Sequence, residues 1–182
     1  FGHERFRARG EGFVAWGRAP VADFRIENAL ASAREPWQLR AMVTYETEII
    51  IDAPPEEVWR HLTDFDQHER WTQHFVLRGR PEVGTRAHIE FSLLGRRNSV
   101  PVRIERADEP RELRWRGGPK GIVDGSHFFL LEGRNGNSQT RFRHGEDFSG
   151  VLAPVVWAFL KAELGPSYSG FNEDLKRRAE PR

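Results

Sequence analysis

The stretch DGSHFFLLEGRNGNSQTRFRHGEDF, residues 124–148, decides the fold of this chain. Two β-prone runs flank the dipeptide Asn135-Gly136, which is typical of a two-residue hairpin turn because both central residues of such a turn need positive φ. A two-residue turn at this point predicts the register of the whole hairpin. In that register, His127 faces His144 directly.

Side chains alternate between the two faces of a strand, so the hairpin sorts its residues into two sets. One set of the second run is polar and must meet water, whereas the first run is apolar on both faces and takes its orientation from its partner. The inward set is therefore predicted to be Gly125, His127, Phe129 and Leu131, together with Thr140, Phe142, His144, Glu146 and Phe148. Two histidines and a glutamate then point into an otherwise apolar interior, where chemistry or polar recognition of a ligand is expected.

Composition excludes several classes of function. The 182 residues carry a net charge of only +1, whereas a nucleic-acid-binding face is usually strongly basic. The chain has no cysteine, which removes disulfides, thiolate catalysis and cysteine-based metal sites. No apolar run approaches the roughly 20 residues that span a bilayer, and the N-terminus lacks the apolar core of a signal peptide. We therefore expect a cytoplasmic protein that has no stable membrane insertion and does not bind nucleic acid.

Residues 1–41 differ in character from residues 42–180. Arg, Gly, Ala and Glu are scattered through the first part without a sustained period, and Met42 is the only methionine. This part is predicted to be an N-terminal extension that is poorly ordered or weakly helical, with a short helix possible over residues 21–34. The alternative is that translation begins at Met42 and that the upstream residues do not belong to the natural protein.

From Val43 onward the pattern becomes regular. Alternating apolar residues predict a first strand, and a proline-rich, acidic segment from residue 52 is typical of a helix start. Residues 64–74 are interpreted as a loop or a short second helix. Strands are then expected over residues 75–80, 86–93, 100–105 and 113–116, followed by the hairpin and a long helix over 151–179. Gly165-Pro166 should kink or break that helix.

This order predicts an α+β domain. A sheet of about seven antiparallel strands with one apolar face must be covered, and only the C-terminal helix is long enough to cover it. One or two short helices follow the first strand. An arched sheet wrapped around one helix tends to leave a cavity between the two layers.

Several sequence landmarks occur in an order that resembles the START-like (SRPBCC) superfamily, the Bet v 1-like helix-grip fold. They are DAPPEEVW at residues 52–59, Trp71, ELRWRGG at 112–118, the hairpin, and FNEDLKRRAE at 171–180. The resemblance is closest to the bacterial polyketide cyclase/dehydratase branch and covers residues 42–180. It implies a helix-grip domain of that family, in which relatives carry Trp-Asn-Pro after the first helix where this chain has Trp71-Thr72-Gln73-His74.

The resemblance also implies a range of functions. Members of the superfamily bind lipids, sterols or aromatic polyketides, some catalyse cyclisation or dehydration, and others act in assembly or activate chaperone ATPases. Fold alone does not choose among these functions. We favour binding of a hydrophobic small molecule by a monomer or homodimer. The alternatives are a cyclase/dehydratase-type enzyme and a protein-interaction module with a vestigial cavity.

The candidate catalytic residues are His127, His144 and Glu146. A histidine or the carboxylate could orient a ligand carbonyl or act as a general base, which typically contributes 10²–10⁴-fold to a rate. The plainer interpretation is that the three side chains satisfy one another's hydrogen bonds, as buried polar groups usually do. A metal site built from the same trio is less favoured because no further ligand spacing supports it. No metal and no cofactor are predicted.

The candidate ligand-binding residues are mostly aromatic, as in apolar pockets that carry a few polar groups. They are Trp71, Phe91, Trp115, Phe129, Phe142, Tyr168 and Asn172. The alternative for each aromatic residue is plain core, which we also favour for Trp59. On the outer face of the hairpin, Phe128 is expected to form a cation–π contact with Arg143.

Overall fold

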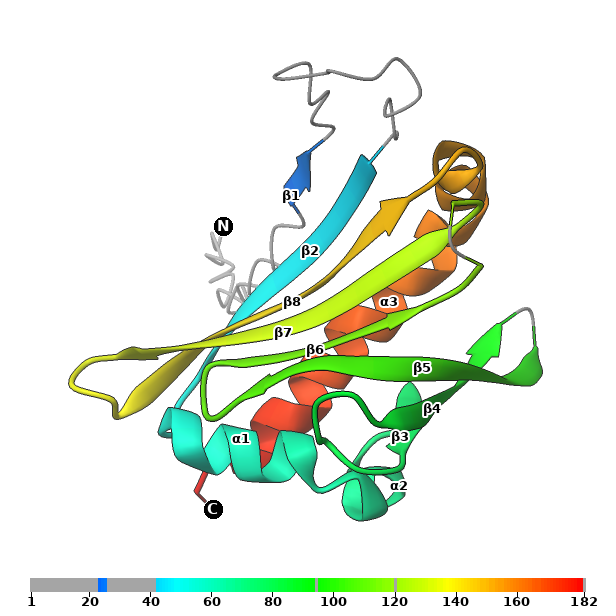
Figure 1. Cartoon of the computed structure of the whole chain (residues 1–182). Helices are drawn as coiled ribbons and strands as arrows, with labels where there is room; N and C mark the ends of the chain where they lie inside the picture. The colour runs from blue at the N-terminus through cyan, green and yellow to red at the C-terminus, as the bar shows by residue number, and fades with distance from the viewer. Residues whose placement is uncertain (1–22, 26–41, 94, 120, 182) are drawn as a thin grey trace, which may run out of the picture.

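The computed structural model describes residues 23–25, 42–93, 95–119 and 121–181. A strongly curved antiparallel sheet wraps around one long C-terminal helix, and two short helices close one end (Figure 1). The strands are β1 (Asp23–Arg25), β2 (Met42–Ile51), β3 (Phe75–Arg78), β4 (Arg86–Leu93), β5 (Arg96–Asp108), β6 (Glu112–Gly117), β7 (Asp124–Arg134) and β8 (Gln139–Ser149). The helices are α1 (Pro55–Thr63), the 3₁₀ turn η1 (Phe65–Gln67), α2 (His68–Trp71) and α3 (Ala153–Ala179).

The strand order in the sheet is β1-β2-β8-β7-β6-β5-β4-β3, and every pairing is antiparallel. The predicted α+β helix-grip architecture, with seven strands β2–β8 around the C-terminal helix, is confirmed. Strand β1 adds three residues to one edge, within the range where a short helix was thought possible. The other residues of 1–41 lie outside the described ranges, so the division at residue 42 stays a prediction.

The register predicted for the hairpin is wrong by two residues. Its loop has four residues, 135–138, because Asn137 takes positive φ (65°) as well as Asn135 and Gly136. The register therefore shifts by two residues, and His127 faces Glu146 instead of His144. A shift of two keeps every side chain on its predicted face, since strand periodicity is two.

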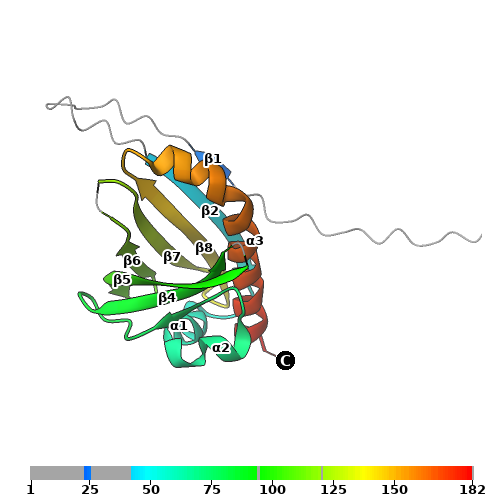
Figure 2. The same cartoon turned by 90° about the vertical axis from the view of Figure 1, so that its right-hand side faces the viewer.

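The inward face of the hairpin is buried as predicted, apart from Glu146, which is half-buried. Phe129 and Phe142 are fully buried there, and Phe171 of α3 packs against them from the other layer. The Phe171 ring stacks on Phe75 of β3 with 4.2 Å between centroids. This aromatic stack fixes the C-terminal half of α3 against the concave side of the sheet (Figure 2).

Helix α3 runs without a break from Ala153 to Ala179, with Pro166 inside it. Its axis bends along its length, as Figure 2 shows, and the helix is continuous, so the full break that was one of the two expectations at Gly165-Pro166 is absent. The bend carries the N-terminal half of the helix across the open end of the sheet. None of the described helices is long and apolar enough to cross a membrane.

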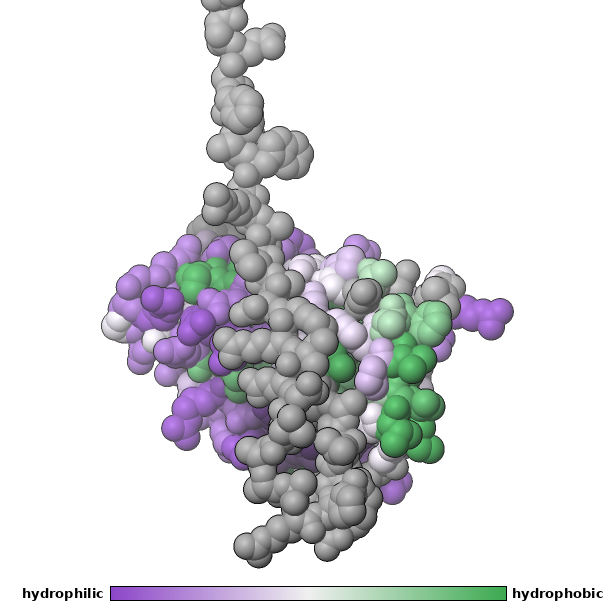
Figure 3. All heavy atoms as spheres, turned by 90° about the horizontal axis from the view of Figure 1, so that it is seen from above, coloured by the Kyte–Doolittle hydropathy of each residue, from purple (hydrophilic) through white to green (hydrophobic). Residues whose placement is uncertain are grey.

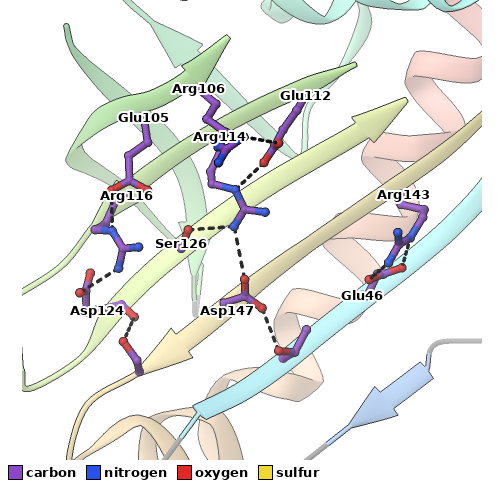
Figure 4. Close-up of polar contacts among 12 residues, drawn as sticks. Glu46, Glu105, Arg106, Glu112, Arg114, Arg116, Asp124, Ser126, Arg143 and Asp147 are labelled. Carbon is purple, nitrogen blue, oxygen red and sulfur yellow. Dashed lines mark hydrogen bonds and ion pairs between the residues drawn. The ribbon is translucent and has the colours of Figure 1, made fainter. Parts of the chain in front are cut away.

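The convex face of the sheet carries ion pairs that run from strand to strand (Figure 4). Arg143 binds Glu46 through two hydrogen bonds of 2.5 and 2.7 Å, so it does not cover Phe128 as predicted. Arg114 covers that ring instead, with its guanidinium carbon 4.9 Å from the ring centroid. Arg114 lies on β6 directly beside Phe128, whereas the β8 partner of Phe128 is Gly145.

Candidate functional site

A cavity of about 290 Å³ lies between the sheet and the N-terminal half of α3. Its walls are mostly apolar, and its polar groups gather at one place. The lining residues are Phe75, Ile89, Phe91, Ser92, Val100, Val102, Trp115, Gly117, Gly118, Pro119, Val123, Gly125, His127, Glu146, Phe148, Leu160, Leu164, Ser167 and Tyr168. An apolar chamber with a small polar end is the usual form of a small-molecule site.

Glu146 of β8 is the charged group at the polar end. Its Oε2 accepts a hydrogen bond of 2.5 Å from the Tyr168 hydroxyl. Its Oε1 makes no hydrogen bond with any described residue, and the side chain keeps 19% of its surface exposed. One carboxylate oxygen is therefore fixed by the protein, and the other is available to a ligand.

His127 of β7 lies immediately behind Glu146 and Tyr168. Its Nδ1 is 3.3 Å from the Tyr168 hydroxyl and 3.7 Å from Glu146 Oε2. The imidazole stacks on the Trp115 indole with 4.3 Å between centroids and only 9° between planes, which locks the ring orientation. Both nitrogens of His127 are therefore engaged by protein groups, since Nε2 lies 2.9 Å from His144 Nε2.

His144 of β8 is completely buried and connects this pair to the core. Its Nδ1 is 2.7 Å from the side-chain oxygen of Asn172 on α3. The Asn172 amide nitrogen donates to Thr47 Oγ1 at 2.9 Å, and Thr47 donates to the His144 carbonyl at 3.2 Å. The result is a closed ring of hydrogen bonds that joins α3 to β2 and β8.

These contacts assign the protons of the two histidines. Because Asn172 presents its oxygen to His144 Nδ1, that nitrogen carries the proton and Nε2 offers a lone pair. His127 must then donate from Nε2 to His144, which leaves His127 Nδ1 facing the Tyr168 hydroxyl. A hydrogen-bonded chain thus runs from Thr47 in the core to Glu146 at the cavity.

The electrostatics agree with this assignment. Burial, and then the neighbouring His127, lower the pKa of His144 well below its ordinary value, so His144 is neutral at physiological pH. Burial, and then the Glu146 carboxylate, raise the pKa of Tyr168 well above its ordinary value, so Tyr168 keeps its proton. Tyr168 is therefore a hydrogen-bond donor in every state of the site.

The structure brings the three predicted catalytic residues together, with different exposure. His127 and Glu146 line the cavity, but His144 lies one step behind His127 and does not reach it. Of the predicted ligand-binding residues, Phe91, Trp115 and Tyr168 line the cavity.

The other predicted ligand-binding residues do not line it. Phe129 and Phe142 are fully buried core, and Asn172 belongs to the hydrogen-bonded chain. Trp71 packs against Phe171 at 5.2 Å between ring centroids. Trp71 is partly buried, packs against the core cluster and does not line the cavity.

Several cavity residues were not among the predicted ligand-binding residues. Leu160 and Leu164 of α3 line the cavity, and they belong to the helical stripe whose next member is Tyr168. The i, i+4 spacing that places Tyr168 inside could have placed them there too. Thr47 gave no such signal, because its role depends on a partner 125 residues away in sequence. Among the described residues, no group of three or more His, Asp or Glu side chains could hold a metal ion.

Comparison with known families agrees with the architecture. The family model described as "Polyketide cyclase / dehydrase and lipid transport" matches residues 42–180. The fold is that of a START-like, SRPBCC-type helix-grip domain. The chain belongs to the polyketide cyclase/dehydrase and lipid transport family. No curated protein matches its sequence.

Solved structures share the fold at low sequence identity. The Zhui aromatase/cyclase from Streptomyces sp. R1128 is 14% identical with a TM-score of 0.59, and the match covers 76% of this chain and 96% of that one. A START superfamily protein from Mycobacterium smegmatis is 15% identical with a TM-score of 0.57, covering 75% and 96%. A protein from Thermus thermophilus is 15% identical with a TM-score of 0.60, also covering 75% and 96%.

Proposed function

We propose that this protein binds an apolar small molecule in the cavity between its sheet and α3, with one polar group of the ligand against Glu146. The observation that carries the proposal is the apolar chamber of about 290 Å³ that ends at a carboxylate oxygen without a partner among the described residues. A hydroxyl or a protonated amine of the ligand would donate to Glu146 Oε1. The family description, which includes lipid transport, supports the same class of ligand.

The apolar part of the ligand would rest on the faces of β4 and β5. Ile89, Phe91 and Val102 form that wall, and Leu160 with Leu164 form the opposite wall. Burying apolar ligand surface stabilises the complex by about 25 cal/mol per Å² before the costs of association. A bicyclic aromatic alcohol combines the apolar surface and the single donor that this lining and polar end call for.

A fluorescence titration with 2-naphthol tests the proposal. Leu164→Trp places an indole in the cavity and should lower the affinity at least tenfold. Val155→Trp is the matched control, because Val155 is 54% exposed on the same helix and does not line the cavity. Wild-type protein that does not bind 2-naphthol, or equal affinities in the two variants, would count against the cavity as the binding site. Native mass spectrometry of protein from its own host would then identify the natural ligand.

An enzyme of cyclase or dehydratase type is the second candidate. It is favoured by the chain of titratable groups behind Glu146, and one fold neighbour is described as an aromatase/cyclase. Glu146 would remove a proton from the carbon beside a carbonyl of the bound ligand. Deuterium incorporation into 2-tetralone in D₂O measures that step directly. The Glu146→Gln variant should bind 2-tetralone and incorporate deuterium no faster than the protein-free control, whereas a pure carrier would show only that background rate with either protein.

The interaction module with a vestigial cavity is less well supported. It predicts a filled interior and a contiguous exposed apolar patch. The interior is not filled. Exposed apolar side chains do gather where α3 begins, as Figure 3 shows in green, and they are Ile122, Val151, Leu152, Val155 and Phe159.

A further inference from the structure

We propose that Tyr168 is a proton relay between Glu146 and His127, and that Asn172 and Thr47 hold the two histidines in the tautomers that the relay needs. The proposal deepens the proposed function and rests on it, because Glu146 is the ligand-facing end of the relay. Glu146, Tyr168 and His127 all line the cavity. His144, Asn172 and Thr47 lie behind them and act as positioning residues.

The Tyr168 hydroxyl has one proton and two neighbours that can accept it. Glu146 Oε2 is 2.5 Å away and His127 Nδ1 is 3.3 Å away. A hydroxyl can donate one hydrogen bond and accept another at the same time. Tyr168 can therefore donate a hydrogen bond to one neighbour while it accepts a hydrogen bond from the other.

Two arrangements with the same number of protons follow. In the first, Glu146 is protonated and donates to Tyr168, and Tyr168 donates to a neutral His127 Nδ1. In the second, His127 is protonated at Nδ1 and donates to Tyr168, and Tyr168 donates to the Glu146 carboxylate. The site passes between them when the Glu146 proton moves to the Tyr168 oxygen as the Tyr168 proton moves to His127. One O–H bond breaks at each oxygen donor, an O–H and an N–H bond form, and Tyr168 is neutral before and after.

The buried part of the chain gives the relay its direction. The Asn172 amide nitrogen donates to Thr47, and this contact turns the Asn172 oxygen toward His144 Nδ1. His144 therefore carries its proton on Nδ1, and its Nε2 is an acceptor. His127 therefore donates through Nε2 in both arrangements, and its Nδ1 is the atom that exchanges a proton with Tyr168. If His144 Nε2 were not an acceptor, neutral His127 could adopt the Nδ1–H tautomer. Its Nδ1 could then not accept a proton from Tyr168, and the relay would be blocked.

The surroundings of His127 leave few other groups that could take part. Strand β8 contributes His144 and Glu146, and α3 contributes Tyr168. In the part of the chain that the structure describes, β3 and β6 meet His127 with the Phe75 and Trp115 rings, which do not titrate. A proton that Glu146 takes from a ligand arrives on Oε1, and a half-turn of the carboxyl group then presents it to Tyr168. From there it would move inward through Tyr168 to His127, which would free the carboxylate to act again.

Nitrogen-15 NMR of histidine side chains tests the relay on the ligand-free protein. The expected tautomers are Nδ1–H for His144 and Nε2–H for His127. Glu146→Gln should shift the His127 Nδ1 resonance in the wild-type background, and this response should fall to less than about a fifth in the Tyr168→Phe background. Tyr45→Phe is the matched control, because the Tyr45 ring lies 5.5 Å from Tyr168 but does not line the cavity. In that background the full response should remain.

Each outcome decides between the relay and a purely structural chain. Opposite tautomers, no response to Glu146→Gln, or a response that persists in Tyr168→Phe would overturn the proposal. A second readout is deuterium incorporation into 2-tetralone at saturating 2-tetralone, which should slow at least tenfold in Tyr168→Phe. Incorporation at the wild-type rate in Tyr168→Phe would also overturn it. Failure of 2-tetralone to bind would contradict the proposed function alone, because the NMR measurement needs no ligand.

Discussion

The Glu146 carboxylate lies directly over the Cα of Gly125, where any side chain on residue 125 would occupy the same space as Glu146 Oε1. The two residues lie on adjacent strands, since the β8 partner of Gly125 is Phe148 and that of His127 is Glu146. The glycine therefore makes room for the carboxylate at the polar end of the cavity.

Gly125→Ala should weaken binding of 2-naphthol by more than about tenfold, because the added methyl group displaces the oxygen that meets the ligand. Loss of a hydrogen bond to a charged group typically costs about 1.5–3 kcal/mol. Fold and stability should change little, since the atoms displaced are the end of a side chain. Gly133→Ala is the control: its methyl group would displace the Asn137 side-chain oxygen, at the far end of the same strand. Equal effects of the two substitutions on Kd would disprove the role given to Gly125.

Acid should destabilise the fold through His68. This buried histidine has Nε2 2.9 Å from the Leu62 carbonyl and accepts at Nδ1 from the Leu77 amide at 3.4 Å, and burial lowers its pKa to about 4. The unfolded chain, with a histidine pKa of about 6.5, binds more protons between pH 6.5 and 4. The free energy of unfolding should therefore fall by up to about 3 kcal/mol over this window as the pH is lowered.

Urea unfolding of His68→Gln at pH 7 and pH 5 measures this contribution. The variant should be less stable at pH 7, but its free energy of unfolding should decline less between the two values. His88→Gln, at an exposed position on β4, should follow the wild-type dependence. An unchanged pH dependence in His68→Gln would show that other groups, with buried His144 foremost, carry the acid sensitivity.

The outer face of the sheet depends on a second glycine. A methyl group on Gly145 would overlap the Phe128 ring and come within 2.5 Å of the Tyr45 carbonyl oxygen on the neighbouring strand. Gly145→Ala should therefore cost about 2 kcal/mol, as overpacking usually does. Calorimetry of the Gly145→Ala/Phe128→Ala pair checks the cause. The double variant should lose less stability than the sum of the single ones, and strict additivity would remove the ring from the explanation.

The sequence pattern predicts faces more reliably than it predicts register. Alternation alone places Phe129, Phe142 and His144 inside, and all three are fully buried. The pairing of His127 with Glu146 depended on the length of one turn, and the second asparagine, Asn137, also takes positive φ. Because either turn length keeps the parity of the strands, the burial prediction was right although the register was wrong by two.

The candidate site, too, could be predicted from the sequence only in part: its residues but not their contacts. Two histidines and a glutamate on one hairpin face are visible in the sequence, and so is the helical stripe that contains Tyr168. Their order from cavity to core is not visible, because it depends on which atoms of β8 and α3 meet. The roles of Asn172 and Thr47 follow from contacts between the two ends of the domain. No local period encodes such contacts.

The N-terminal half of α3 provides a last prediction, from two aromatic residues that lie two positions apart. Trp157 is 7% exposed and packs on Tyr45 and Phe148 with 5.2 and 5.7 Å between ring centroids, whereas Phe159 is 77% exposed. Trp157→Ala should lower the free energy of unfolding by about 3–5 kcal/mol, and Phe159→Ala should change it by less than about 0.5 kcal/mol. Chemical denaturation measures both. Two small effects would mean that this half of the helix is not docked on the sheet, and the wall formed by Leu160 and Leu164 would then not close the cavity.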